Sequence, residues 1–214
     1  MRLGVFGGTF NPIHVGHLRA VIEVQETFTL DRLLLIPSAN PPHKGAEDIA
    51  AAEDRLQMVR LAVQGLPSLE ASDVELARAG PSYTIETLQY FHDDFGPESV
   101  IHFLVGLDAF SEITTWKSYH RLFATAHFIV MTRPGSKLNN LKRFIHTYIS
   151  RDYEYDTAAS CYTHPRWCSI FCLNITHLEI SATQIRERIR QDRSIRFLVP
   201  DTVEQFIKTK GLYR

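Results

Sequence analysis

The 214-residue sequence lacks the features that mark secreted, membrane-spanning and nucleic-acid-coating proteins. It has three cysteines, an odd number that does not suggest a disulfide framework. No apolar stretch approaches the roughly 20 residues that span a bilayer, and no charged leader with an apolar core precedes the first strand-like residues. The formal net charge of −1 gives no general attraction for a polyanion. We therefore expect a cytoplasmic protein with no membrane and no nucleic-acid partner.

The sequence also lacks internal repeats and low-complexity linkers. Its apolar fraction of 44% and charged fraction of 22% are ordinary for a globular protein. A chain of this length can bury one well-formed core, and a second full domain is not expected. We predict a single domain over residues 1–214, with a C-terminal helical portion from about 181 to 214. Whether it acts as a monomer or a homo-oligomer is left open by the sequence.

Hydrophobic periodicity predicts strands that alternate with helices. The predicted strands are Arg2–Phe6, Arg32–Ile36, a strand near Ser72–Leu76, Val100–Val105, His127–Thr132, Ser169–Leu173 and His177–Ile180. The predicted helices are Val15–Phe28, Ala52–Gly65, Thr84–Phe95, Leu138–Ile149, Ser181–Arg190 and Asp201–Lys210. This order indicates an α/β fold with a doubly wound, mainly parallel sheet.

Polar segments follow several of these predicted strands. They are Gly7–His17, Asn40–Lys44, Gly106–Asp108 and Arg133. Ligands of doubly wound sheets bind beyond the carboxyl ends of the strands, so these segments should gather along one edge of the sheet.

The first segment has the composition of a phosphate site. A strand that runs through Gly7-Gly8 into the start of a helix leaves backbone N–H groups where an anion can sit. His14 and His17 lie about one turn apart and add donors that can carry charge. A zinc site here is a weaker alternative, because no carboxylate or cysteine stands beside the two histidines at ligand spacing.

A second phosphate site is predicted at residues 181–186. Ser181 and Thr183 offer hydroxyls and N–H groups at a helix start, with Gln184 at the capping-box spacing. Arg186 follows within the next turn. Two such sites suit a polyphosphate, and the absence of an obvious nucleophile favours direct phosphoryl or nucleotidyl transfer. Mg²⁺ would travel with the triphosphate, since the sequence supplies no dedicated magnesium cage.

Two motifs carry a family resemblance. Gly7-Gly8-Thr9-Phe10-Asn11-Pro12 with His14-x-Gly16-His17, together with Ile180-Ser181-Ala182-Thr183-x-x-Arg186, resembles the HxGH nucleotidyltransferase superfamily and its Rossmann-like fold. Further segments are similar to those of bacterial nicotinate-nucleotide adenylyltransferases, namely Pro41-Pro42-His43-Lys44, Pro81-Ser82-Tyr83-Thr84, Gly106-x-Asp108, Trp116, Arg133-Pro134-Gly135 and Gly211-Leu212-Tyr213-Arg214.

The resemblance implies adenylyl transfer from ATP to nicotinate mononucleotide, giving nicotinate adenine dinucleotide and pyrophosphate. It implies catalytic roles for His14, His17 and Arg186. It implies ATP contacts for Gly7, Gly8, Thr9, Phe10, His17, Gly106, Asp108, Arg133, Ser181, Thr183 and Arg186. It assigns Asn40, Lys44, Tyr83, Thr84 and Trp116 to the nicotinate nucleotide.

Three positions depart from the family pattern: Asn11 stands where aspartate is usual, Ala182 where serine is commoner, and Lys117 where some relatives have an aromatic residue. Residues 150–172 match no motif, and Cys161, His164, Cys168 and Cys172 form either a zinc set or a variable region with reduced thiols.

Two other functions remain open on the sequence. A pantetheine-phosphate or cytidylyl-type transferase would keep the chemistry and change the acceptor. A non-catalytic nucleotide sensor would bind through the same loop. Preference for the nicotinate over the nicotinamide mononucleotide is also open.

Overall fold

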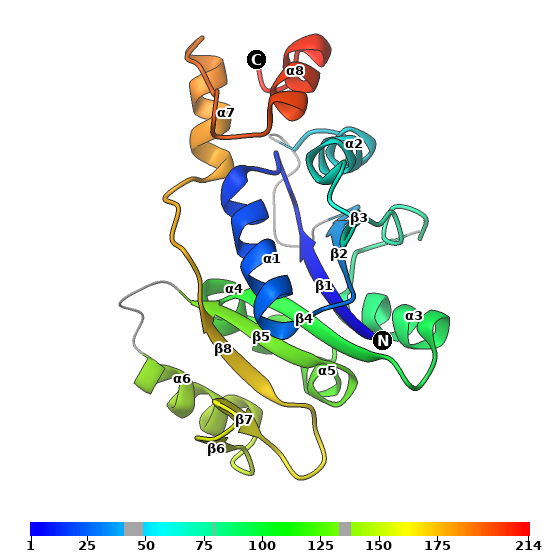
Figure 1. The fold of residues 1–214 in the computed structure, drawn as a ribbon, viewed down its shortest axis with the longest axis vertical. Helices are drawn as coiled ribbons and strands as arrows, with labels where there is room; N and C mark the ends of the chain where they lie inside the picture. The colour runs from blue at the N-terminus through cyan, green and yellow to red at the C-terminus, as the bar shows by residue number, and fades with distance from the viewer. Residues whose placement is uncertain (41–48, 79, 133–137) are drawn as a thin grey trace.

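A computed structural model of the chain describes residues 1–40, 49–78, 80–132 and 138–214. An eight-stranded sheet forms its centre, with the order β3-β2-β1-β4-β5-β8-β7-β6 (Figure 1). Strands β3, β2, β1, β4, β5 and β8 pair in parallel, and β7 and then β6 pair antiparallel at the β8 edge. The predicted doubly wound, mainly parallel sheet is confirmed. The strands are β1 (Arg2–Gly8), β2 (Arg32–Pro37), β3 (Leu69–Ala71), β4 (Val100–Gly106), β5 (His127–Thr132), β6 (Glu154–Asp156), β7 (Cys161–Thr163) and β8 (Ile170–Asn174).

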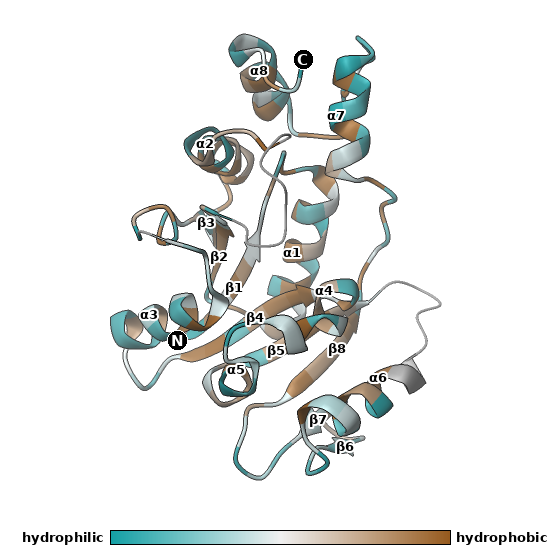
Figure 2. Ribbon diagram, turned by 180° about the vertical axis from the view of Figure 1, so that it is seen from behind, coloured by the Kyte–Doolittle hydropathy of each residue, from teal (hydrophilic) through white to brown (hydrophobic). Residues whose placement is uncertain are grey.

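Helices cover both faces of the sheet. The helices are α1 (Val15–Phe28), α2 (Ala52–Val63), α3 (Thr84–Phe95), α4 (Leu107–Ser111), the 3-10 turn η2 (Ile113–Thr115), α5 (Tyr119–Thr125), α6 (Leu138–Phe144), the π-helical turn η3 (Ile145–Ile149), α7 (Ala182–Arg190) and α8 (Asp201–Lys210). Helix α1 lies in front of β4 and β5 in Figure 1, and the view from behind in Figure 2 brings α4 and α5 forward. None of the described helices is long and apolar enough to cross a membrane.

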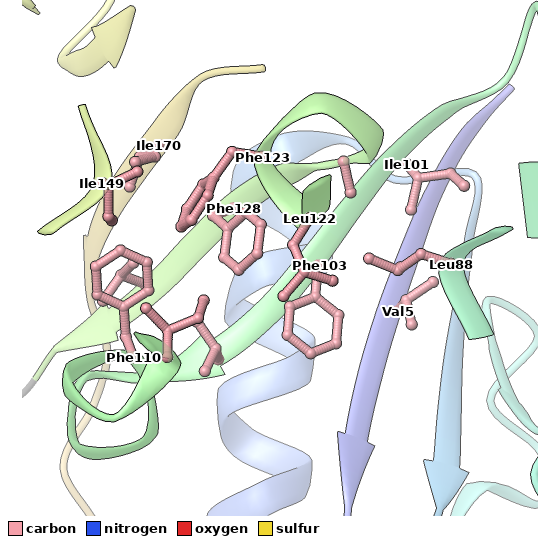
Figure 3. Packing of buried hydrophobic residues seen from close by; sticks show 14 of the residues in the cluster. Val5, Leu88, Ile101, Phe103, Phe110, Leu122, Phe123, Phe128, Ile149 and Ile170 are labelled. Carbon is pink, nitrogen blue, oxygen red and sulfur yellow. The ribbon is translucent and has the colours of Figure 1, made fainter. Parts of the chain in front are cut away.

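The two faces of the sheet belong to separate clusters of buried side chains, because successive residues of a strand point to opposite faces. Leu3 and Val5 of β1 join the cluster under α3, α4 and α5, part of which is drawn in Figure 3. Phe6 joins the other cluster, under α1 and α2. Apolar residues of α7 and α8, among them Ile185 and Ile207, pack into that second cluster. The 181–214 segment thus packs against the same cluster as α1, and α7 and α8 lie beyond the carboxyl end of β1 (Figure 1).

Two predicted strands are wrong. In place of a strand near Ser72–Leu76, β3 ends at Ala71 and Asp73 starts a turn, its carbonyl accepting from the N–H groups of Leu76 and Ala77. Residues 177–180 form no strand, because β8 ends at Asn174 and the chain continues in an irregular path toward α7. Both mistakes have one cause. A short run with apolar residues does not show that a partner strand is available, whether its side chains are partly buried, as at 72–76, or mostly exposed, as at 177–180.

Candidate active site

The site lies at the carboxyl ends of β1 and β4, where the strand order reverses direction. A cavity of about 710 Å³ opens there. Its walls come from the loop between β1 and α1, the start of α4 and the segment that runs from β8 into α7. The residues predicted for the site that line it are Thr9, Phe10, His14, His17, Gly106, Asp108, Ser181, Thr183 and Arg186.

The loop after β1 folds back on itself. Phe10 has φ 46, an uncommon left-handed conformation for a side chain of this size. Its ring lies over Gly8, where an added Cβ would come within 3.0 Å of the ring. Gly8 therefore sits beneath Phe10 and outside the cavity wall. Gly7 faces the other way, and a Cβ there would approach Phe103 at 4.0 Å.

The two histidines meet face to face at the start of α1. Their rings are stacked with centroids 3.7 Å apart. The spacing of the motif also explains the glycine between them, since a Cβ on Gly16 would lie 3.1 Å from Nδ1 of His14. A side chain at position 16 would thus push against the His14 ring. Gly16 has helical geometry, so the requirement is for space and not for backbone freedom.

The two rings have different surroundings. Nδ1 of His17 accepts the backbone N–H of His14 at 3.3 Å, which leaves Nε2 as the atom that carries the proton in the neutral ring. His14 is buried, and desolvation lowers its pKa to about 4. His14 is therefore neutral at pH 7 in the unliganded chain, whereas the sequence predicted that both rings can carry charge. Its buried Nδ1 has no hydrogen-bond partner within the described structure.

The start of α7 forms the opposite wall. Ser181 caps the helix by accepting the N–H of Gln184 at 3.2 Å, and the Gln184 side chain accepts the N–H of Ser181 at 3.1 Å. This predicted capping box leaves the N–H groups of Ala182 and Thr183 without partners inside the helix. Both residues line the cavity, as a phosphate site requires.

Arg186 joins the two walls. Its Nη1 donates to the carbonyl of Asn11 at 2.9 Å, and its Nη2 donates to the Thr183 hydroxyl at 3.4 Å. Its buried Nε finds no hydrogen-bond partner among the described atoms. The guanidinium is thus held by two contacts, which use two of its five N–H groups and leave the others for a ligand. The structure brings the two predicted phosphate-binding segments to a single cavity.

The start of α4 contributes Gly106 and Asp108. Gly106 ends β4 and precedes the helix, and no atom lies within 4 Å of where its Cβ would be. Asp108 is exposed in the first turn of α4, at the cavity wall. Gly106 occupies the N-cap position of α4, so Asp108 does not cap this helix.

The described residues among those assigned to the nicotinate nucleotide do not line this cavity; they are Asn40, Tyr83, Thr84 and Trp116. The carbonyl of Asn40 accepts the N–H of Ser82 at 3.4 Å, and Tyr83 and Thr84 follow directly into α3. Trp116 packs edge-on against Phe103, with ring centroids 6.0 Å apart. Tyr83 and Trp116 both pack against the buried cluster under α3, α4 and α5, on the sheet face opposite α1, and form a second group of contacts there.

Lys117 is a member of this group that the sequence left unassigned. Its ammonium lies 4.2 Å from the centre of the Tyr83 ring and 2.7 Å from a carboxylate oxygen of Glu86. A cation therefore stands next to the residues predicted to hold an anionic mononucleotide. Lys44 and Arg133 lie outside the described residues.

Arg55 is a site residue that the sequence analysis missed. Its side chain is 1% exposed and donates to three backbone carbonyls, of Ala50, Thr9 and Ala39, at 2.9, 2.9 and 3.2 Å. It thereby links the phosphate loop to the loop after β2. The signal was an arginine on the apolar face of α2, at helical spacing from Val59 and Ala62.

Among the described residues, no group of three or more histidine, cysteine, aspartate or glutamate side chains is placed to hold a metal ion. Cys161 pairs with Phe171 across β7 and β8, so Cys172 points to the opposite face. Nδ1 of His164 accepts the N–H groups of Arg166 and Trp167. The candidate zinc set of Cys161, His164, Cys168 and Cys172 is therefore not assembled.

Comparison with known proteins gives a consistent result. A family model described as cytidylyltransferase-like matches residues 5–188. A probable nicotinate-nucleotide adenylyltransferase of Desulfatibacillum aliphaticivorans is 47% identical over 219 residues, covering 100% of both chains. One from Geobacter sp. (strain M21) is 41% identical over 213 residues, covering 100% of this chain and 98% of the relative.

The fold also matches solved structures. The Plasmodium falciparum nicotinic acid mononucleotide adenylyltransferase complexed with NaAD superposes with a TM-score of 0.75 at 16% identity, covering 99% of this chain and 97% of the other. At that identity the likeness concerns the fold.

Proposed function

The chain belongs to the nicotinate-nucleotide adenylyltransferase family, and from this premise we propose how its residues carry out adenylyl transfer from ATP to nicotinate mononucleotide. In this reaction a phosphate oxygen of the mononucleotide attacks the α-phosphorus of ATP. A new P–O bond forms, the bond to the β-phosphate breaks, and pyrophosphate leaves. The products are nicotinate adenine dinucleotide and pyrophosphate.

One observation carries the assignment of the site. Two segments 175 residues apart meet where Arg186 donates to the backbone carbonyl of Asn11 on the wall of the 710 Å³ cavity. Each segment offers N–H groups or cationic donors to an anion. A triphosphate is long enough to reach both, whereas a single phosphate would use one of them.

Each group then has a chemical role. The N–H groups of Ala182 and Thr183 and the guanidinium of Arg186 hold the β- and γ-phosphates. The Nε2–H of His17 donates to oxygens of the α-phosphate and stabilises charge that develops as the bond to pyrophosphate breaks. The His14 ring is stacked on the His17 ring, and we assign it to the α-phosphate as well, as a neutral hydrogen-bond donor. Asp108 accepts from ribose hydroxyls, and Gly106 leaves room for the nucleoside.

The mononucleotide lies on the other side of β1. Trp116 offers a ring for stacking on the pyridine, and Asn40, Tyr83 and Thr84 surround its phosphate and ribose. Mg²⁺ enters as the ATP complex and is treated as part of the substrate, since this ion keeps water and phosphate ligands and needs few from the protein.

The test is a pair of variants that report on the two halves of the site. His17→Ala should lower kcat by about 100- to 1,000-fold, the usual effect of deleting one donor to the transition state, with little change in ATP affinity. Trp116→Ala should raise KM for the mononucleotide and leave KM for ATP nearly unchanged. The measurement is pyrophosphate release at varied concentrations of each substrate.

Two results would contradict these roles. Turnover of His17→Ala within a few-fold of wild type would remove the histidine from the chemistry. Selective loss of ATP binding in Trp116→Ala would place the tryptophan on the ATP side of the site.

The choice of acceptor has its own test, in which pyrophosphate release is compared for the nicotinate and nicotinamide mononucleotides. Equal or reversed efficiency would overturn the assignment of nicotinate mononucleotide as the acceptor. Tight ATP binding without pyrophosphate from any acceptor would favour a nucleotide sensor.

A further inference from the structure

Asn11 connects three parts of the chain behind the phosphate cavity. Its carbonyl accepts from Nη1 of Arg186 at 2.9 Å. Its side-chain Oδ1 accepts the N–H of Ala50 at 3.0 Å and the hydroxyl of Tyr213 at 2.9 Å. We expect the position of the Asn11 backbone carbonyl, and with it the direction of Arg186, to depend on the contacts that hold the Asn11 side chain.

Tyr213 reaches Asn11 from the segment that follows α8. Gly211 ends α8 in the left-handed conformation, and the N–H of Leu212 returns to the carbonyl of Ile207 at 3.0 Å. Tyr213 itself has φ 67, an uncommon conformation for an aromatic residue. Its ring packs against the buried cluster under α1 and α2. The chain therefore takes an unfavourable backbone shape that delivers one hydroxyl to the phosphate loop.

The surroundings of that hydroxyl are cationic. Burial raises the pKa of Tyr213 above its ordinary range, while the positive charges of Arg186 and Arg55 act in the opposite direction. The hydroxyl is thus protonated at neutral pH and close to both guanidinium groups. A protonated hydroxyl can donate to Asn11 without neutralising the cations, so the charge of Arg186 stays available to a phosphate.

We propose that Tyr213 is a positioning residue for the triphosphate site, which holds Arg186 in place through Asn11. The inference rests on the proposed function for its catalytic readout, but the geometry concerns polyphosphate binding by itself. Without the hydroxyl, the Asn11 side chain keeps the Ala50 contact but loses one of its two anchors, so the backbone carbonyl of Asn11 that accepts from Arg186 is less firmly fixed. The effect should fall on ATP and spare the mononucleotide, whose predicted residues lie across β1.

The experiment compares Tyr213→Phe with Tyr155→Phe. Each deletes one hydroxyl, and Tyr155 is an exposed residue of β6, far along the sheet order from β1. We expect Tyr213→Phe to lower kcat/KM for ATP by roughly 3- to 10-fold, the effect of one buried hydrogen bond, with KM for nicotinate mononucleotide unchanged. Inorganic tripolyphosphate, titrated by calorimetry, should bind more weakly by a similar factor. Tyr155→Phe should match wild type in all three measurements.

A double-variant cycle separates positioning from general structural support. Lysine at position 186 keeps the charge and lacks the planar fork that Asn11 and Thr183 hold. In an Arg186→Lys background, Tyr213→Phe should therefore lower kcat/KM for ATP by less than about two-fold, because no planar guanidinium remains to be aligned. The proposal is wrong if the two substitutions lower kcat/KM for ATP by factors that simply multiply in the double variant. It is also wrong if Tyr213→Phe lowers kcat/KM equally for ATP and for the mononucleotide.

Failure of the proposed function looks different from failure of this inference. A wild-type protein that forms no pyrophosphate would refute the reaction, and the tripolyphosphate titration would still test Tyr213. Unchanged tripolyphosphate affinity in Tyr213→Phe would refute the positioning role even in a fully active enzyme.

Discussion

Acid should destabilise this protein through His102, a buried residue away from the catalytic groups. His102 of β4 pairs with His127 of β5, and the two rings stack with centroids 5.3 Å apart. Phe28 and Phe171 also contact the His102 ring, and Nδ1 has no partner in the described part of the chain. Burial, then the charges of His127 and Arg2, lower the pKa of His102 to about 4.

Whether acid stabilises or destabilises the fold depends on which state, folded or unfolded, binds more protons. In the unfolded chain a histidine titrates near its ordinary value of about 6.5. Between pH 6.5 and 4 the unfolded state therefore binds more protons than the folded state, and stability falls as the pH falls. Linkage over that window gives a loss of about 2 kcal/mol between pH 7 and pH 5, and about 3 kcal/mol once the pH is below 4.

The assay is urea unfolding at pH 7, 6 and 5 of wild type and His102→Phe. The variant keeps an aromatic ring against Phe28 and Phe171 and removes the titrating group. Its free energy of unfolding should fall by about 2 kcal/mol less than that of wild type between pH 7 and pH 5. The control is His120→Phe at an exposed position, which should keep the wild-type slope. Parallel pH dependences for wild type and His102→Phe would refute the reasoning.

Two further predictions concern the site. Gly16→Ala places a methyl group 3.1 Å from Nδ1 of His14 and should lower kcat while the thermal midpoint stays near that of wild type; an alanine variant with wild-type kcat would show that the His14 ring can move without consequence. Arg55→Met removes the donor from three backbone carbonyls and should lower the free energy of unfolding by about 3 kcal/mol, at about 1 kcal/mol for each hydrogen bond. Urea unfolding measures the change, and a variant as stable as wild type would mean that the cost of burying the guanidinium cancels its hydrogen bonds.

The sequence predicted most elements because their signals are local. Helices α1, α3 and α8 begin and end where periodicity and capping residues placed them, and β5 has the predicted bounds. The antiparallel strands β6 and β7 were missed because each has three residues, too few to show an alternating pattern, and β6 is exposed throughout. The strand expected near Ser72–Leu76 failed for the converse reason. Its apolar residues are partly buried, but the chain turns there.

Sequence alone predicted which residues can hold phosphate and that the first of these segments follows a strand of a parallel sheet, because glycines, capping residues and histidine spacing act over a few residues. Only the tertiary structure decided that Arg186 touches Asn11, that Arg55 links two loops and that Tyr213 comes to stand behind both. It also decided that His14 is neutral, since a pKa depends on burial by elements distant in the chain. Contacts between distant segments and loss of solvent leave no pattern in neighbouring residues, so they appear only when the chain is folded.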